Sequence, residues 1–447
     1  MLAAFTKVLP LAPCIACACL LACREQDVQR PNVVLVVIDT LRADAVRPGD
    51  PGAPMPFLSE LASRALYFER AHSSSSWTLP SMGSLFLARY PSQHGLGSSG
   101  WGGTQPSSAS LPEVLKSAGY RTAARVAHPA LKRTKIGRGF DDFALVLDEG
   151  ASVTDAGLDW LGAGGNSKSP FFLYLHYLDT HNPYRAHPGI TPARGSLSGR
   201  PDEALGYNPG AGTLADSEAG RQAAWNYSAD EVARMRQLYD GETSFVDQKL
   251  QALFEGLSRM DLLERTILIF TSDHGEEFGE HGVFGHGASL FGAVARVPLV
   301  IVLPDGTHGR IRTPVQTGGL GTTLLEELEI PAPDDFAIPA FSLRRDEPGA
   351  PPVHLDLPPA PQLKLHLHRR GVVDELGGLL VSDDGTEQFY RMDADGVERG
   401  PFAGIPNAEE LRSSLREVRD LAHDERPEIE QLNEEEIEQL RELGYVP

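Results

Sequence analysis

Cysteine is scarce in this chain, and all of it lies at one end. The four cysteines, Cys14, Cys17, Cys19 and Cys23, fall within the first 23 residues. Because no cysteine follows in the rest of the sequence, the body of the chain contains neither a disulfide nor a thiolate metal site.

Positive charge is also in short supply. Lysine and arginine total 40 against 61 aspartate and glutamate residues, which gives a formal net charge of −21. Such a field repels nucleic acid and anionic lipid, so we expect no nucleic-acid partner. It offers no general attraction to sulfate or phosphate esters either. An anionic ester substrate would therefore have to be bound by a local positive charge such as a metal ion.

The sequence lacks a hydrophobic run that is long enough to span a bilayer comfortably. The stretch from Val8 to Ala22 is apolar and built from small residues, and Lys7 precedes it. Its length is typical of the core of a signal peptide rather than of a membrane span. We therefore predict that residues 1–22 are a signal peptide.

The end of this run resembles a bacterial lipobox. It has the sequence Leu20-Leu21-Ala22-Cys23, whose cysteine would be acylated and become the mature N-terminus. Residues 23–30 would then form a tether, and Arg24, in place of an aspartate, favours the outer membrane. We expect a periplasm-facing lipoprotein of the bacterial cell envelope, held at the membrane by the lipid on Cys23. The alternative is an ordinary signal peptide with incidental cysteines.

Short apolar runs alternate with amphipathic segments between residues 31 and 330. The runs predict buried strands over Asn32–Ile38, Pro170–Leu178, Thr266–Thr271 and Val297–Val302. The amphipathic segments predict helices over Pro56–Ala65, Leu111–Ala118 and Glu231–Leu257. This alternation predicts an α/β domain with a doubly wound sheet sandwiched by helices.

The pattern changes towards the C-terminus. Proline-rich connections follow residue 330, and Gly378 to Met392 has the pattern of a hairpin around Asp383-Asp384-Gly385. We predict a small α+β subdomain over residues 331–405 and a charged, helical tail over residues 406–447.

Charged and polar residues directly follow two of the predicted strands. Asp39 ends the first strand, and Asp273 and His274 end the third. Charge at these positions is costly unless it meets a partner, and a divalent cation is the simplest partner that all three share. Two carboxylates and an imidazole suit Zn²⁺, Mn²⁺, Mg²⁺ or Ca²⁺. The alternative for a single such aspartate is the N-cap of a helix.

Three separated stretches together resemble the sulfatases of the alkaline phosphatase superfamily. They are Pro31–Asp44, Ser76–Gly95, and Thr271–Glu276 with Gly285–Gly287 and Arg296–Pro298. Each stretch alone is a weak match to the family, but the order and spacing of all three are specific to it. The resemblance implies an alkaline-phosphatase-like mixed sheet and a hydrolase of anionic esters that uses one divalent metal ion.

The nucleophile position departs from the sulfatase pattern. Sulfatases carry a cysteine or serine there, which is oxidised to formylglycine, followed by any residue, proline, a small residue and arginine. This chain has Thr78-Leu79-Pro80-Ser81-Met82. Threonine cannot yield the aldehyde and Met82 replaces the arginine, so we expect no formylglycine. A metal-bound Thr78 is still a usable nucleophile and favours a phosphoester or phosphonate ester. Alternatively, Thr78 is inert or caps the helix beginning near Pro80.

Three histidines complete the predicted site. The resemblance implies that His181 contacts the ester oxygens and that His286 lies on the substrate or its leaving group, and either could act as a general acid. His128 follows a strand and is a candidate for the substrate-binding rim. Asp179 with His181 and His286 could instead hold a second metal, but the spacing favours one.

The neighbouring acidic residues receive a plainer interpretation. Glu276 and Glu277 are expected to form the solvated start of a helix rather than part of the site.

The sequence thus supports three functions. The first is metal-dependent hydrolysis of a sulfate or phosphate ester with Thr78 as nucleophile. The second is transfer of a phosphate-linked group to a surface glycan or lipid. The third is a non-catalytic binding lipoprotein that kept the fold, which the substitution at Met82 and the sequence Gly292-Ala293-Val294 favour.

Overall fold

A computed structural model describes residues 30–98, 109–133, 136–147, 150–164, 169–202, 205, 227–360, 366–393, 398–419 and 438. The predicted signal peptide, Cys23 and nearly all of the tether lie outside these residues, as do much of the loop after residue 205 and most of the C-terminal tail. None of the helices within the described ranges is long and apolar enough to cross a membrane.

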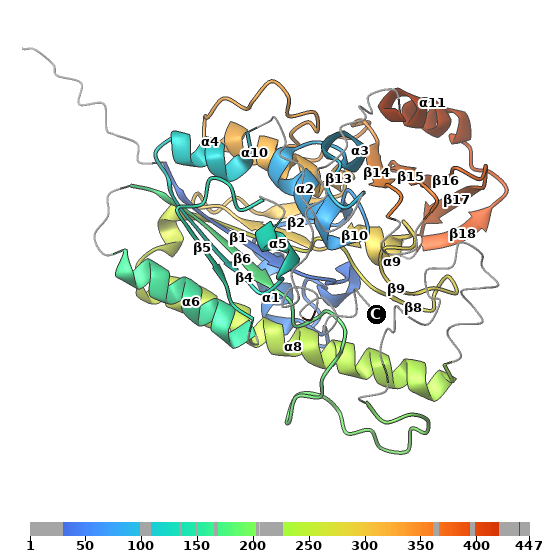
Figure 1. The fold of residues 1–447 in the computed structure, drawn as a ribbon, viewed down its shortest axis with the longest axis horizontal. Helices are drawn as coiled ribbons and strands as arrows, with labels where there is room; N and C mark the ends of the chain where they lie inside the picture. The colour runs from blue at the N-terminus through green and yellow to red at the C-terminus, as the bar shows by residue number, and fades with distance from the viewer. Residues whose placement is uncertain are drawn as a thin grey trace, which may run out of the picture. The chain divides into compact units, whose positions relative to one another are not determined.

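The core of the fold is an eight-stranded mixed sheet (Figure 1). Its strands lie in the order β12 (Gly309–Ile311), β2 (Leu66–Phe68), β11 (Leu299–Val302), β7 (Thr266–Thr271), β1 (Asn32–Ile38), β6 (Phe171–Tyr177), β4 (Arg121–Val126) and β5 (Asp142–Leu145). The strands from β7 to β5 are parallel, whereas β11 runs antiparallel to both of its neighbours. The predicted doubly wound mixed sheet is therefore confirmed.

The central strand shows why this sequence forms a buried sheet. All seven residues of β1 are buried, and the strand pairs in parallel with β6 on one side and β7 on the other. Alternate side chains enter two different cores, with Val33 and Leu35 on one face and Val34 and Val36 on the other. A continuous β-branched run is what a strand covered on both faces requires.

Helices cover both faces of the sheet (Figure 1). One core contains residues of α1 (Pro56–Ser63), α6 (Gly150–Ala163) and α8 (Ala229–Arg259). The other contains residues of α2 (Thr78–Leu87), α4 (Leu111–Ser117) and α10 (Leu320–Glu327). Shorter helices are α3 (Pro91–His94), α5 (Ala130–Arg133) and α9 (Gly292–Ala295).

A second, antiparallel sheet follows the main domain in sequence. It consists of β14 (Val353–Leu357), β15 (Arg369–Val373), β16 (Gly378–Ser382), β17 (Glu387–Met392) and β18 (Glu398–Phe402), in that order. The helix α11 (Ala408–Arg419) packs on it through a small apolar cluster that includes Leu379, Phe389 and Leu411. The predicted hairpin corresponds to β16 and β17.

Two small sheets complete the fold. One has the order β10 (Arg296–Val297), β3 (Ala71–His72) and β13 (Val315–Gln316), and the other pairs β8 (Glu277–Phe278) with β9 (Phe284–Gly285).

Candidate active site

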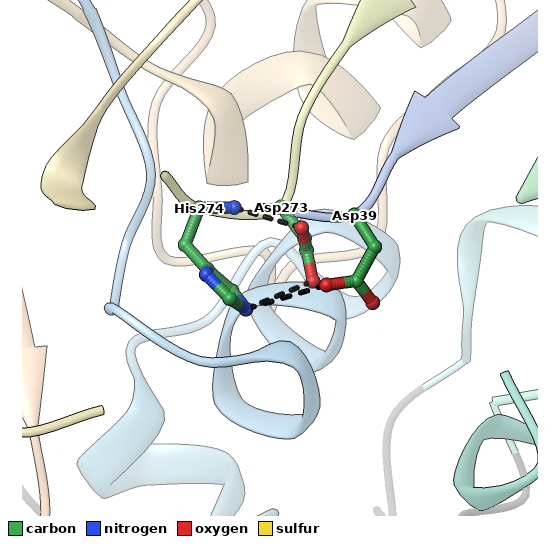
Figure 2. A group of neighbouring side chains, drawn as sticks. All are labelled: Asp39, Asp273 and His274. Atoms are coloured by element: carbon green, nitrogen blue, oxygen red, sulfur yellow. Dashed lines mark hydrogen bonds and ion pairs between the residues drawn. The ribbon is translucent and has the colours of Figure 1, made fainter. Parts of the chain in front are cut away.

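The carboxyl ends of β1 and β7 bring the predicted metal ligands together. Val37 pairs with Thr271 in the parallel register, so Asp39 and Asp273, each two residues further on, leave the sheet side by side. His274 follows directly, and Figure 2 shows the three side chains converging. One ligand atom from each lies within 4.8 Å of the others, and all three residues are buried.

Local hydrogen bonds orient these side chains. The backbone N–H groups of Thr40 and His274 donate to Oδ1 of Asp273, at 3.2 and 2.9 Å. His274 directs Nδ1 at the carbonyl oxygen of Gly275, at 2.9 Å, which leaves Nε2 facing the carboxylates. Since an N–H at Nδ1 fixes the tautomer, Nε2 carries a lone pair, as a metal ligand must.

Two buried oxygens at this point make no hydrogen bond. They are Oδ1 of Asp39 and Oδ2 of Asp273. Buried carboxylate oxygens normally have a donor, and these two face the Nε2 lone pair of His274 instead. Oxygen and nitrogen acceptors that converge without a donor fit a divalent cation. Within the described parts of the chain, this is the one group of three or more such ligands.

The electrostatics agree with that fit. Burial acts to raise the pKa of Asp39, but its hydrogen bond with His176 and the surrounding histidines lower it well below its usual range. Burial and the charge of Asp39 together raise the pKa of Asp273 to about 7. Two carboxylates this close cannot both be ionised cheaply, and a cation between them removes the repulsion.

Thr78 lies against this cluster. Its Oγ1 donates to Oδ2 of Asp39 at 3.3 Å and lies 3.4 Å from Nε2 of His274. The helix α2 begins at Thr78 itself, and its N-cap is Trp77. The alternative that Thr78 caps a helix starting near Pro80 is therefore wrong, because its hydroxyl points at Asp39 and His274.

The three predicted histidines also lie at this site. The rings of His274 and His286 are 4.5 Å apart between centroids, and those of His286 and His181 are 5.0 Å apart. His128 lies 6.5 Å from His181 by the same measure. Burial lowers the pKa of His181, that of His286 to about 4 and that of His128 to about 3, so these rings favour the neutral form.

His176 is a site residue that the sequence analysis missed. It belongs to β6, where it pairs with Val37 of β1. Its Nε2 donates to Oδ2 of Asp39 at 3.1 Å, and Nδ1 accepts the hydroxyl hydrogen of Tyr174 at 2.7 Å. In the sequence, His176 stands out only as a lone histidine in a strand of aromatic and aliphatic residues. Its contact with Asp39 becomes clear only once the strand order is known.

The prediction for Glu276 and Glu277 is wrong. Both are buried, and the chain here enters the short strand β8 instead of a helix. Glu276 accepts hydrogen bonds from Tyr184 Oη at 2.8 Å and from Nδ1 of His286 at 3.0 Å. Glu277 accepts one from Ser289 Oγ at 2.9 Å. The segment is not a solvated helix start, because Glu277 belongs to β8, which pairs with β9.

Met82 takes the place where the sulfatase pattern has arginine. It is fully buried in the apolar core of the α2 face, and the hydroxyl of Tyr174 lies 4.0 Å from its sulfur. This position therefore supplies no charge to the site.

Comparisons with known proteins agree with this architecture. The phosphonate monoester hydrolase of Agrobacterium radiobacter superposes with a TM-score of 0.69 at 16% identity, covering 91% of this chain and 99% of that one. A protein solved with its substrate, D-glucosamine-2-N,6-O-disulfate, superposes with a TM-score of 0.70 at 16% identity, covering 90% and 100%. This chain therefore shares the fold of these two proteins.

The sequence comparisons identify the family. The sulfatase family profile matches residues 31–330, so the chain belongs to the sulfatase family. Human iduronate 2-sulfatase is 27% identical over 336 residues, which cover 62% of this chain and 60% of that protein. Rat arylsulfatase K is 25% identical over 360 residues, covering 69% and 62%. The chain spans about three fifths of the length of these relatives.

Proposed function

We propose that this protein is a metal-dependent hydrolase of anionic esters in which Thr78 is the nucleophile. The observation that carries the proposal is the position of the Thr78 hydroxyl, in contact with both Asp39 and His274 at the start of α2. Backbone N–H groups in the first turn of a helix favour a bound anion, so the anionic ester group would bind next to the Thr78 hydroxyl.

Each residue has a distinct part in the proposed reaction. A divalent cation held by Asp39, Asp273 and His274 would lower the pKa of the Thr78 hydroxyl and offset the charge of the ester. Thr78 would pass its proton to Nε2 of a neutral histidine, His286 or His181, as Oγ1 bonds to phosphorus or sulfur and the bond to the leaving oxygen breaks. The imidazolium formed in this way would then protonate the leaving oxygen. Water then cleaves the ester on Thr78 and restores its hydroxyl.

We favour a phosphoester or phosphonate ester over a sulfate ester. Threonine does not form the aldehyde hydrate that sulfatases use, but an activated alkoxide can attack phosphorus in line. The fold relatives include a phosphonate monoester hydrolase, and the sequence relatives include iduronate 2-sulfatase, so both ester classes belong in the test.

Activity on three aryl esters with and without Mn²⁺ tests the proposal. The substrates are bis(p-nitrophenyl) phosphate, p-nitrophenyl phenylphosphonate and p-nitrophenyl sulfate. We expect Thr78→Ala to abolish turnover and Thr78→Ser, the matched control, to retain part of it, because serine keeps the hydroxyl. Full activity in Thr78→Ala would remove Thr78 as the nucleophile.

A non-catalytic binding protein is the competing function, and Met82 is the observation that favours it. Elemental analysis of the purified protein separates the two, since a pseudoenzyme that lost its metal would contain none. Product analysis with a labelled donor and a glycan or lipid acceptor separates hydrolysis from the transfer reaction.

We further propose that the mature protein is a lipoprotein facing the periplasm. This rests on the sequence Leu20-Leu21-Ala22-Cys23, which lies outside the described residues. Radiolabelled palmitate should label the wild type and not Cys23→Ser. Equal labelling of both would contradict a lipid on Cys23.

A further inference from the structure

The C-terminal sheet contacts the segment of chain that follows His274. Glu398, the first residue of β18, accepts a hydrogen bond at Oε2 from the backbone N–H of Gly292, at 3.0 Å. Its other oxygen, Oε1, lies 3.5 Å from Nε2 of His281. The approach to Gly292 is close, because a Cβ there would lie 2.9 Å from the carboxylate. One side chain of the C-terminal sheet therefore contacts this segment at two separate points.

His281 lies between two carboxylates. Its Nδ1 is 3.4 Å from Oε1 of Glu277, and its Nε2 is 3.5 Å from Oε1 of Glu398. The side chain of Glu277 is fully buried, and those of His281 and Glu398 are each 19% exposed. The imidazole ring stacks on Phe291 with 4.0 Å between the ring centroids, and it meets Tyr390 of β17 edge-on at 6.3 Å. We call Glu277, His281 and Glu398 the carboxylate–imidazole cluster.

The cluster has two acids and one base, so its charge depends on how many protons it binds. With the imidazole protonated and both carboxylates ionised, one negative charge is in excess; one further proton makes the cluster neutral, and loss of the imidazole proton leaves two negative charges. The other ionisable side chains that act on its members are Glu280, Arg296 and Tyr390. Glu280 is itself paired with Arg42 at 2.7 Å. Two carboxylates around a neutral imidazole would therefore repel each other in a largely buried place.

The folded protein favours proton binding by this cluster. Burial raises the pKa of Glu398 to about 7 and also raises that of Glu277. Burial acts to lower the pKa of His281, but its carboxylate neighbours raise it above 6.5. The stability that Glu398 contributes is thus present below pH 4.5 and is lost as the pH rises through about 7. The contribution of His281 is present below pH 6.5 and is lost at higher pH, so both changes have the same sign.

The segment that the cluster contacts also carries His286. Glu277 of β8 lies opposite Gly285 of β9, the residue directly before His286. Gly287, the residue after it, donates its N–H to the carbonyl oxygen of Ser76 at 2.8 Å, close to the start of α2. The backbone on both sides of His286 is therefore held. We call residues 277–295 the His286 segment.

We propose that Glu398 is a positioning residue that the C-terminal sheet supplies to the candidate active site, and that the carboxylate–imidazole cluster holds the His286 segment most firmly when it is protonated. Its effect on turnover rests on the proposed function, in which His286 moves a proton. Its effect on the segment itself requires no turnover, because the contacts of Glu398 with Gly292 and His281 are present in the protein alone.

Hydrogen exchange of the full-length protein, with Mn²⁺ present throughout, measures this hold directly. Protection factors of peptides from the His286 segment, corrected for the intrinsic exchange rate at each pH, should fall about tenfold between pH 5 and pH 8 in the wild type. In Glu398→Gln, whose amide does not titrate, they should change about threefold or less over the same range. Equal protection at both pH values in the wild type, or an equal fall in Glu398→Gln, would overturn the proposal.

Glu387→Gln is the matched control for Glu398→Gln. Glu387 begins β17 of the same sheet, and its carboxylate pairs with Arg412 at 2.8 Å. This variant should keep the full wild-type fall in protection. It also accounts for the pH dependence of metal binding, which affects all three proteins alike. Loss of the pH dependence in Glu387→Gln would show that it does not arise from Glu398, and would count against the cluster.

An NMR titration of the wild type gives a second test, which holds even if Glu398→Gln does not fold. Histidine is labelled with carbon-13 at Cε1, and the signal missing from His281→Gln identifies His281. Its pKa should lie above 6.5, because two carboxylates face the ring. A pKa at or below 6.5 would overturn the proposal.

Turnover separates positioning from a purely structural contact. The kcat of Glu398→Gln divided by that of the wild type should be about one at pH 5 and rise to about threefold at pH 8, because only the wild type gains the second carboxylate charge. A ratio below one that does not change with pH would reduce Glu398 to a structural contact and overturn its positioning role. Absence of ester turnover in every variant and the wild type would instead refute the proposed function and leave the exchange result intact.

Discussion

The buried carboxylate of Glu276 supports the sharpest test of how the site works. It accepts hydrogen bonds from Tyr184 Oη at 2.8 Å and from Nδ1 of His286 at 3.0 Å. The bond holds Nδ1 of His286 and so orients the ring. We infer that Glu276 is a positioning residue that acts through His286, and that Glu276→Gln isolates this role because glutamine keeps the shape of the side chain.

The expected loss follows from the chemistry of the bond. A glutamine presents one oxygen and one NH₂ group, so it cannot accept from both Tyr184 and His286. Losing one hydrogen bond to a charged group costs about 1.5–3 kcal/mol, which corresponds to a fall of about 10- to 150-fold in kcat. Because His286 would act on the leaving oxygen, the loss should grow as the phenol leaving group becomes less acidic, while KM changes little.

The assay measures kcat for a series of aryl esters with substituted phenols, together with bound metal. Glu277→Gln is the matched control, since Glu277 is equally buried but contacts Ser289 and His281 instead of His286. A loss in Glu276→Gln that is the same for acidic and weakly acidic phenols would refute the reasoning. So would an equal loss in Glu277→Gln.

Three further changes test the surroundings of the site. His176→Ala should weaken metal affinity about 10- to 100-fold, measured by calorimetric titration, because Asp39 loses the bond that orients it; an unchanged Kd would contradict that role. Gly275→Ala should reduce metal affinity and activity together, since a Cβ there would lie 2.2 Å from the carbonyl oxygen of Ala293; wild-type metal binding would show that the loop can shift freely. Asp356→Asn should lower the free energy of unfolding by about 1–3 kcal/mol at pH 7, measured by urea denaturation. Burial acts to raise the pKa of Asp356, but its imidazole partner and hydrogen bonds lower it below 3.8, so this stability is present above that pH and is lost as the pH falls through the folded-state pKa. The difference between wild type and Asp356→Asn should therefore shrink towards pH 3, and a constant difference would exclude the ionised carboxylate as its source.

The strands could be predicted because their signal is local. Asn32–Ile38 and Thr266–Thr271 have the predicted bounds, since a run that must be buried on both faces contains little except aliphatic and β-branched residues. The polar residues that end such runs could also be placed, because parallel strands present their carboxyl ends at one edge of a sheet. Asp39, Asp273 and His274 were therefore candidates before any contact was known.

The residues that surround this group could not be predicted in the same way. His176 lies inside a strand, and its contact with Asp39 exists because β6 happens to neighbour β1. The sequence around Glu276 has the pattern of a solvated helix start. In the structure, Glu276 directly precedes β8, is buried and accepts a hydrogen bond from His286. Burial of a charged side chain depends on partners far away in sequence, and no local pattern records them.

By itself, the sequence determined the sheet, the family to which the chain belongs and the three candidate metal ligands at the carboxyl edge of the sheet, because apolar runs and the residues that end them are short-range properties. It also determined that the body of the chain has no cysteine. Only the tertiary structure decided which histidine contacts Asp39 and which glutamate contacts His286. Those arrangements depend on strand order and on contacts between charged residues that are far apart in the sequence. Such contacts form only when the chain folds.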